Sequence, residues 1–249
     1  MSLKPLLEIS VDSTESAQAA ERGGAHRVEL CSNLLEGGVT PSAGIIEATR
    51  VRVAIPIHVM IRPRGGDFSY SEAEFEAMKL DIDATKNLRA NGVVLGILHS
   101  DGNIDVDRTR ALVERARPLS VTFHRAFDFV PDAFHSLEDA IRAGAGRILT
   151  SGGKPKAEDS LAPLASLIQT AGSRIVITVC GGVRAHNVKK ILQTTHAREI
   201  HVGQSGVALA IRADSSQVNS NIRLGEADAP NLQRGVVSTE KVRELLDAC

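Results

Sequence analysis

The fold is decided by one stretch of the chain, SVTFHRAFDFVPDAFHSLEDAIRAGAGRILTS (residues 120–151). It opens with the β-branched and apolar run SVTFHR (120–125), continues with a helical pattern from Pro131 to about Ala143, and ends with the run RILTS (147–151). A strand, a helix of about 10–15 residues and another strand indicate a βαβ unit with parallel strands. The stretch therefore predicts a parallel sheet covered by helices.

The same plan recurs along the whole chain. Short apolar runs alternate with helical patterns at LLEIS (6–10), RVELC (27–31), IHVMIR (57–62), VVLGIL (93–98), SVTFHR (120–125), RILTS (147–151), RIVITV (174–179) and EIHVG (199–203). Eight βα units in 249 residues match a (β/α)8 TIM barrel, which typically takes about 250 residues. The sequence therefore predicts the α/β class and one TIM-barrel domain over residues 1–249.

An internal repeat supports the barrel. The segments AAERGGAHRVEL (19–30), NLRANGVVLGIL (87–98) and AIRAGAGRILTS (140–151) each combine a helix end, a glycine-bearing stop and a buried strand. Glycine ends helices because it adopts the left-handed conformation readily. Repeats of this kind are expected where a barrel consists of copied βα units. Helices are predicted near residues 12–22, 41–50, 71–89, 105–115, 131–143, 157–171, 184–194 and 238–248.

One segment resists a regular prediction. Residues 207–237 are polar and show no clear periodicity. Such long loops are usually functional or mobile. We expect an irregular segment at the mouth of the barrel, followed by a terminal helix over 238–248.

Composition narrows the class of protein. The net charge is −1, with 43% hydrophobic and 24% charged residues, so a basic face for nucleic acid is not expected. No run approaches the roughly 18 apolar residues of a membrane helix, and no signal peptide is evident at the start. We expect a cytoplasmic protein without a membrane or nucleic-acid partner. In that reducing compartment its cysteines, Cys31, Cys180 and Cys249, should be free thiols.

Polar residues occupy the strands at positions where alternation points side chains into the barrel. Parallel strands are usually almost entirely apolar, so this is unusual. One interpretation is a salt-bridged plug that pairs Glu8 or Glu29 with His58 or Arg62. We favour a functional site instead, because many polar groups from different strands converge, with Glu8, Glu29 and His124 as candidate general acids or bases. The inward set comprises Glu8, Ser10, Glu29, Cys31, His58, Met60, Arg62, Thr122, His124, Thr150, Thr178, Cys180 and His201.

Glycines suggest where an anion could bind. Gly181 and Gly182 follow the seventh strand, and Gly203 and Ser205 follow the eighth. Barrel enzymes often bind phosphate in these two loops through backbone N–H groups. The alternative is that the glycines only permit tight turns. A second candidate anion cradle is formed by Arg62 and Arg64 with the following glycines at 65–66.

The cysteines raise the question of copper. Cu(I) prefers thiolate and thioether ligands, and it tolerates imidazole. Cys31, Met60 and Cys180 share the inward phase, and His58, His124 and His201 could assist. No two of these form a tight CxxC-like motif, and a lone strand-end cysteine is more often a small buried apolar residue than a ligand. No nucleotide-cofactor motif is evident.

Several long segments resemble the CutC family of copper-homeostasis proteins. The matching segments cover about residues 6–206 and are VELCSNLLEGGVTPS (28–42), HVMIRPRGGDFSYS (58–71), FHRAFD (123–128), RILTSGG (147–153) and the glycine pair at 181–182. The resemblance implies a barrel, a cytoplasmic setting, self-association as a dimer or tetramer, and a role in copper handling or tolerance.

The resemblance also implies site residues. Cys31 occupies the position of the family's barrel-mouth cysteine and is the expected Cu(I) ligand, with Met60, His58 and Cys180 as further candidates. Eukaryotic relatives are associated with a second cysteine near the end of the next helix, but residues 48–52 contain no thiol here. The family's polar set falls on Glu8, Glu29, Arg62, His124, Arg125, Asp128 and His201, which resembles an enzyme's set more than a metal carrier's.

Three hypotheses follow from the sequence. In the first, the chain is a copper-homeostasis protein that binds Cu(I) through Cys31. In the second, it is an enzyme that acts on a small phosphorylated or carboxylated metabolite, held by the arginines and the two glycine loops. In the third, it is a structural or interaction protein with a vestigial site. The sequence leaves open whether the chain is an enzyme.

Overall fold

The computed structural model describes residues 5–212 and 233–249. Eight strands close into a barrel in chain order, and every neighbouring pair is parallel. The (β/α)8 TIM barrel expected from the sequence is confirmed. The strands are β1 (Leu6–Val11), β2 (Arg27–Leu30), β3 (Ile57–Met60), β4 (Gly92–Leu95), β5 (Ser120–Phe123), β6 (Arg147–Thr150), β7 (Val176–Val179) and β8 (Glu199–Val202).

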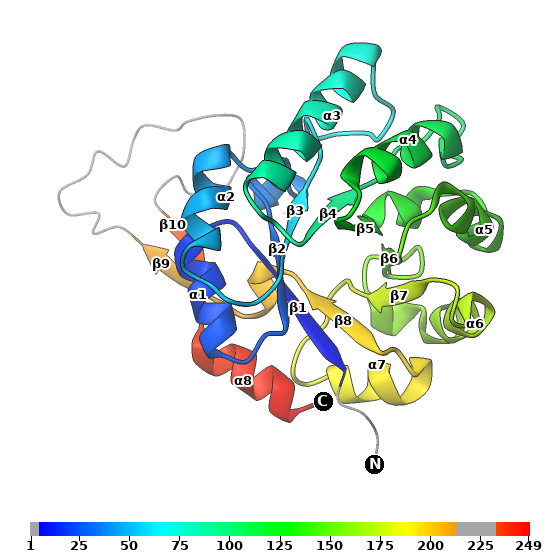
Figure 1. Cartoon of the computed structure of the whole chain (residues 1–249). Helices are drawn as coiled ribbons and strands as arrows, with labels where there is room; N and C mark the ends of the chain where they lie inside the picture. Colours follow the sequence, from blue (N-terminus) through cyan, green and yellow to red (C-terminus); the bar gives the residue numbers. More distant parts are fainter. Residues whose placement is uncertain (1–4, 213–232) are drawn as a thin grey trace, which may run out of the picture.

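Helices form a ring around the barrel (Figure 1). They are α1 (Thr14–Arg22), α2 (Ala43–Arg50), α3 (Glu72–Asn87), α4 (Val106–Ala116), α5 (Ala133–Ala143), α6 (Leu161–Ala171), α7 (Val188–Thr195) and α8 (Thr239–Asp247). Four short 3-10 helices lie in the connections: η1 (Leu34–Glu36), η2 (Arg125–Phe129), η3 (Ala157–Asp159) and η4 (Gln204–Gly206). The start of α3 carries a capping box, in which Ser71 and Glu74 each accept from the other's backbone N–H.

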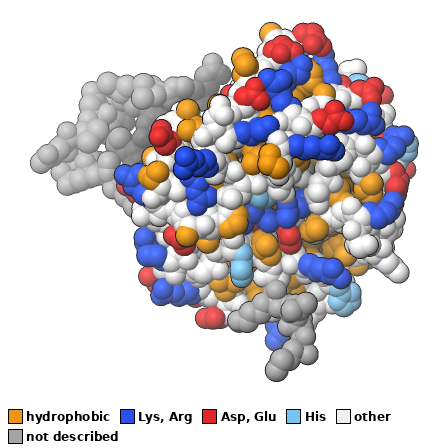
Figure 2. Space-filling model, in the orientation of Figure 1, with side chains coloured by type: hydrophobic (Ala, Val, Ile, Leu, Met, Phe, Trp, Pro, Cys, Tyr) orange, Lys and Arg blue, Asp and Glu red, His pale blue; other side chains and the backbone are white. Residues whose placement is uncertain are grey.

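The apolar core lies between the strands and the helices. Outward-facing strand residues such as Leu7, Ile9 and Val28 are fully buried there. On the surface, charged side chains of both signs are interspersed over the face shown in Figure 2. The interior of the barrel differs from this apolar layer, because its strands contribute buried charged and polar side chains, among them Glu8, Arg27 and His58.

Two glycines of the fourth strand region create the space for interior histidines. A Cβ atom at Gly92 would approach the ring of His58 to 2.6 Å, and one at Gly96 would approach Nδ1 of His124 to 2.5 Å. Both distances are below any tolerable contact. The glycines therefore allow two imidazole rings to lie inside the barrel.

The inward phase expected for Thr150 is wrong. Arg147, at the start of β6, bonds to Glu199 inside the barrel, and Leu149 lines the interior cavity. Alternation along the strand then directs Thr150 outward, where its hydroxyl donates to Asp128 of η2 at 2.5 Å. The run RILTS forms the strand as predicted, but its apolar character alone does not determine which of its side chains point into the barrel.

The irregular segment expected over 207–237 contains regular structure at both ends. Strands β9 (Ala208–Arg212) and β10 (Gln233–Val237) pair antiparallel, from Ala208 opposite Val237 to Arg212 opposite Gln233. The backbone of Val237 donates to Ser16, which ties this hairpin to α1 beside the barrel (Figure 1). Residues 213–232 lie outside the described ranges.

The buried carboxylate of Glu199 yields a prediction about stability. Glu199→Gln should lower the free energy of unfolding by about 3–5 kcal/mol, because the buried guanidinium of Arg27 keeps only Glu8 as an ionic partner and the partly buried guanidinium of Arg147 loses its carboxylate partner. Urea denaturation followed by circular dichroism measures the change. The control is Glu138→Gln, which breaks an exposed pair with Arg174 and should leave the midpoint unchanged. Equal midpoints for the two variants would contradict a stabilising role for the buried carboxylate.

Candidate functional site

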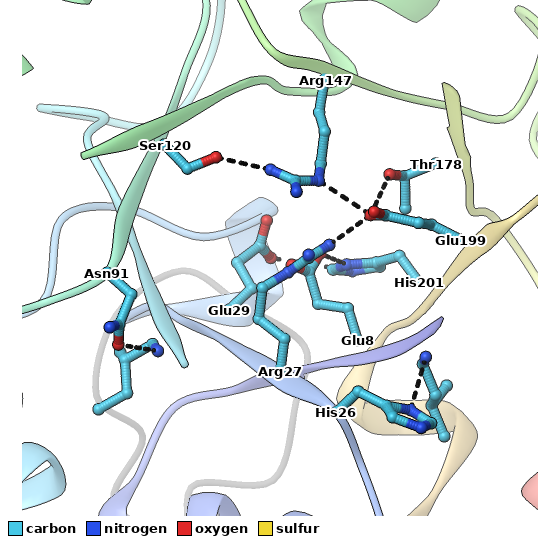
Figure 3. Close-up of polar contacts among 12 residues, drawn as sticks. Glu8, His26, Arg27, Glu29, Asn91, Ser120, Arg147, Thr178, Glu199 and His201 are labelled. Carbon is cyan, nitrogen blue, oxygen red and sulfur yellow. Dashed lines mark hydrogen bonds and ion pairs between the residues drawn. The ribbon is translucent and has the colours of Figure 1, made fainter. Parts of the chain in front are cut away.

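A network of buried charges occupies the barrel interior. It consists of Glu8, Arg27, Arg147, Glu199 and His201, and we call it the Glu8 network (Figure 3). Arg27 donates to Glu8 through Nε and to Glu199 through Nη2, the latter at 2.8 Å. Arg147 donates to Glu199 at 2.9 Å, and Nδ1 of His201 lies 2.7 Å from Oε1 of Glu8. Charges so deeply buried are found in proteins only when they are paired in this way.

The network keeps Glu8 ionised. Burial alone would raise the pKa of this carboxyl, but the hydrogen bond from His201 and the charge of Arg27 outweigh it and hold the pKa well below its usual range. Burial alone would lower the pKa of His201, but the neighbouring Glu29 and Glu8 raise it. Because both oxygens of Glu8 are engaged, its role is to position His201 rather than to contact a ligand.

Glu29 lies next to this network, and its carboxylate has fewer hydrogen-bond partners than that of Glu8. Its side chain is nearly fully buried, and burial raises the pKa of its carboxyl despite the charge of His201. Its Oε2 atom accepts from the Cys31 thiol at 3.5 Å and lies 3.8 Å from Nε2 of His201. Its Oε1 atom has no hydrogen-bond partner among the described residues. Glu29 therefore has free capacity for a ligand.

A cavity of about 1470 Å³ opens above these groups, at the carboxyl ends of the strands. We call it the barrel cavity. Glu29, His201, Met60 and Leu149 line it from the strands, and the loops after the strands complete its wall with His124, Arg125, Phe68, Phe129, Gly203 and Ser205. The wall thus combines apolar rings with a few convergent polar groups, as small-molecule sites commonly do.

His124 lines this cavity and carries a buried ring nitrogen without a partner among the described residues. Its Nδ1 atom accepts from the backbone N–H of Ala126 at 3.2 Å, which places the ring proton on Nε2. Burial and the positive charge of Arg62 lower the pKa of His124 to about 3, so the ring is neutral near pH 7. Nε2 has no protein partner in the described ranges. A neutral imidazole with an unused N–H group suits recognition of an oxygen atom on a ligand.

The arginines expected to bind an anion have different roles. Arg125 lines the cavity and remains about half exposed, while it bonds to Asp128 and Ser151. Arg62 donates through Nη1 to the carbonyls of Glu36 and Gly38, and through Nη2 to the carbonyl of Gly66. It therefore links the loop after β2 to the loop after β3. Arg62 also lines the cavity, and its Nε atom has no hydrogen-bond partner among the described residues, so its expected contact with an anion stays a prediction.

Arg64 and Asp128 also act within loops and do not line the cavity. Arg64 bonds to Glu74 and Asp67, which fixes the connection between β3 and α3. Asp128 accepts from Thr150 and from the backbone N–H of Ser151 at 2.9 Å. Their polar atoms are engaged within these loops, and their predicted ligand-binding roles stay predictions.

The two glycine loops separate in the structure. Gly203 and Ser205 line the cavity, whereas Gly181 and Gly182 do not. A Cβ at Gly181 would lie 2.7 Å from Cβ of Ser151, and both glycines of this pair have positive φ. This pair therefore permits a tight turn, the alternative that the sequence had left open, and its expected anion contact stays a prediction.

The candidate soft ligands are not arranged as a ready metal site. Cys31 is fully buried and packs on Met60 and Val94, while Cys180 is buried near Arg125 and Asp128. Burial, with the charge of Glu29, raises the pKa of the Cys31 thiol, which disfavours the thiolate that binds metal.

Of the three histidines expected to assist these ligands, His58 does not line the barrel cavity. His58 lies deep under Gly92 with its pKa lowered by burial to about 4. Within the described residues, the one convergent set of three or more potential His, Cys, Asp or Glu ligands is Glu8, Glu29 and His201. The set does not include a cysteine.

Sequence reasoning missed three members of the network. Arg27, Arg147 and Glu199 are the first residues of β2, β6 and β8. The signal was present, since Arg27 precedes Glu29 by two positions and Glu199 precedes His201 by two, which places each pair on one face. These residues pair with Glu8 and with each other, whereas the expected partners of a salt-bridged plug were His58 and Arg62.

These features define the class of protein: a parallel (β/α)8 barrel with a charged cavity at the carboxyl ends of its strands, the place where barrels bind small molecules. No helix in the described ranges is long and apolar enough to cross a bilayer. A model of the CutC family matches residues 5–206. The chain belongs to the CutC family.

Relatives agree with this membership. A CutC family protein of Mesorhizobium japonicum is 47% identical over 197 residues, which cover 79% of this chain and 76% of that protein. The human copper homeostasis protein cutC homolog is 49% identical over 196 residues, 79% of this chain and 72% of its own length. A CutC family protein of Chromobacterium violaceum is 43% identical over 244 residues, 98% and 97% of the two chains.

Solved structures show the same fold. The Streptococcus agalactiae crystal structure described under the name copper homeostasis protein CutC has a TM-score of 0.76 at 34% identity, covering 80% of this chain and 98% of that one. N-(5'-phosphoribosyl)anthranilate isomerase of Pyrococcus furiosus has a TM-score of 0.59 at 15% identity, covering 98% of each chain. This second likeness concerns the fold alone.

The neutral ring of His124 makes stability depend on pH. In the unfolded chain a histidine takes up its proton near pH 6.5, whereas the folded pKa is about 3. Its contribution to stability is therefore complete above pH 6.5 and is lost as the pH falls toward 3, by up to about 3 kcal/mol at pH 4. We expect the urea midpoint of His124→Asn to fall less than that of the wild type between about pH 7 and pH 4.

The asparagine can still accept from the backbone of Ala126, so the variant isolates the titration. His99→Asn, at an exposed cavity-rim histidine, is the control and should keep the wild-type slope. If the wild type and His124→Asn lose stability equally on acidification, His124 is not held neutral in the fold.

Proposed function

We propose that the barrel cavity binds a small anionic metabolite, that the protein is an enzyme acting on it, and that this activity underlies a role in copper homeostasis. The copper role rests on the names of the relatives, among them the human and mouse copper homeostasis protein cutC homologs. The chemistry rests on one observation. Glu29, the adjacent pair His124 and Arg125, and His201, from three parts of the chain, line one cavity.

The wall of the cavity supplies the means to recognise an anion. Arg125 provides a cation that is still about half exposed, and His124 provides an N–H donor without a protein partner in the described part of the chain. Gly203 and Ser205 add a loop after β8, where barrels often hold phosphate. A phosphoryl or carboxylate group fits this set, because charge-assisted hydrogen bonds from such donors are the strong ones.

The floor of the cavity supplies reactive groups. Glu29 has an unsatisfied oxygen, and His201 is oriented by Glu8 at 2.7 Å. A buried carboxyl beside an oriented imidazole is an arrangement typical of catalytic sites. Of the three residues first considered as acid or base, Glu29 keeps this role in the proposal. Glu8 becomes a positioning residue, and His124 becomes a donor.

A second candidate, direct binding of Cu(I) as cargo, is favoured by one contact. Cys31 packs against Met60, which brings a thiol beside a thioether. Direct Cu(I) binding comes second, because the Cys31 thiol is fully buried with a raised pKa and residues 48–52 contain no second cysteine. Neither candidate is built on Cys180, whose thiol is fully buried and has a pKa raised by burial and by the charge of Asp128.

The setting proposed for this activity is the cytoplasm, with the chain assembled as a dimer or tetramer. The support is the family resemblance together with buried thiols at Cys31 and Cys180, which suit a reducing compartment.

Anions should stabilise the protein against heat. At about 100 times its dissociation constant a ligand adds about 2.7 kcal/mol, or about 5–10 °C in a chain of this size. We expect such a shift from inorganic phosphate or from members of a panel of small phosphorylated and carboxylated metabolites, measured by differential scanning fluorimetry. Arg125→Gln should abolish the shift. The matched control Arg174→Gln, at an exposed arginine of α6–β7, should keep it.

The absence of a shift with every anion tested would overturn the proposal. A shift that Arg125→Gln preserves would place the anion elsewhere on the protein.

Copper is tested by anaerobic titration of Cu(I) against a competing chelator. Because the convergent ligand set contains no cysteine and burial raises the pKa of the Cys31 thiol, we expect weak binding that is the same in wild type and Cys31→Ser. Tight binding of one Cu(I) per chain that Cys31→Ser removes would instead make Cu(I) the direct ligand and Cys31 its anchor.

A further inference from the structure

We infer that the floor of the barrel cavity binds a divalent transition-metal ion between the Nε2 atom of His201 and a carboxylate oxygen of Glu29. The site is distinct from any thiol site. It uses one nitrogen and one oxygen from the protein, and it leaves the remaining positions of the ion open to the cavity.

The first argument is the orientation of His201. Its Nδ1 atom lies 2.7 Å from Oε1 of Glu8, whose other oxygen accepts from Arg27. Metal-binding histidines almost always donate their second ring N–H to such an oxygen, which fixes the ring and makes its other nitrogen a better ligand. Here the other nitrogen, Nε2, faces Glu29, and both residues line the cavity.

The second argument is the spacing of the two ligand atoms. Nε2 of His201 and Oε2 of Glu29 are 3.8 Å apart. An ion bonded to both at about 2.0–2.1 Å requires them to be no more than about 4.2 Å apart. The observed spacing meets this limit without a movement of the backbone. A direct hydrogen bond between the two atoms would need a shorter distance.

The third argument is the free oxygen of Glu29. The residue is only 4% exposed, yet its Oε1 atom has no hydrogen-bond partner among the described residues. A buried polar atom without a partner is costly. Moreover, ligand atoms of two carboxylates, from Glu8 and Glu29, lie within 4.8 Å of one another and of His201. Arg27 compensates Glu8, and a cation bound to Glu29 would compensate the second charge.

The donor atoms indicate the class of ion. Imidazole and carboxylate suit borderline divalent ions such as Zn²⁺ or Cu²⁺, whereas Cu(I) prefers sulfur. The open positions of the ion face the space assigned above to the anion. The role of the ion as a Lewis acid toward that anion rests on the proposed function. Binding of the ion does not rest on it, because Glu29 and His201 are present in the cavity without the anion.

The test is competition between the full-length protein and a chromophoric chelator for Zn²⁺, with no anionic metabolite present. We expect binding of one Zn²⁺ per chain. His201→Gln and Glu29→Gln should each weaken it by more than the roughly 10–100-fold expected on loss of a supporting partner such as Glu8. The control His99→Gln, at the cavity rim, should bind Zn²⁺ as the wild type does.

A spectrum of the wild-type protein gives a second readout that does not depend on whether the variants fold. The visible spectrum of the Co²⁺-loaded wild type should show d–d bands without a thiolate charge-transfer band. Weak Zn²⁺ binding that the two ligand variants leave unchanged, or a thiolate band that Cys31→Ser removes, would overturn the metal site. Loss of the metal site would leave anion-induced stabilisation intact, and loss of that stabilisation would leave Zn²⁺ binding intact, so the two proposals fail separately.

Discussion

The buried carboxylate of Glu8 is the constraint on which the rest of the site depends. It lies inside the barrel, held by Arg27 on one side and by His201 at 2.7 Å on the other. A charge in this position is tolerable only when its partners are fixed, and removing one partner of such a pair is strongly destabilising. Arg27 in turn requires Glu199, which requires Arg147. The interior is therefore a chain of mutually dependent ions, and its last member, His201, is an oriented imidazole at the floor of the cavity.

The loops convert this interior into a cavity. Arg62 holds the loop after β2 and the loop after β3 by donating to carbonyls of both, so the wall does not collapse onto Glu29. Arg64 and Asp128 satisfy other loop atoms in the same way. Among the buried polar atoms without a partner in the described residues, Glu29 Oε1, Arg62 Nε and His124 Nε2 belong to side chains that line the cavity. In the proposed function these groups recognise a ligand with oxygen atoms.

The sequence predicts the barrel well because the eight strand runs and the glycine-ended helices repeat. It also predicts that Glu8, Glu29, His124 and His201 lie inside, because alternation along a strand is a local property. The roles of Arg62 and Arg64 could not be predicted, since they depend on where loop carbonyls and distant carboxylates lie. The prediction that Thr150 points into the barrel was wrong, because a short apolar run does not show which of its residues face inward. The hairpin of β9 and β10 has too little apolar alternation to be visible in the sequence.

The most direct test of where the chemistry lies is a crystal structure of the protein soaked with inorganic phosphate. The account predicts phosphate in the barrel cavity, with oxygen atoms within hydrogen-bonding distance of His124 Nε2 and the Arg125 guanidinium. Phosphate bound only on the outer surface, with the cavity holding no anion, would contradict it.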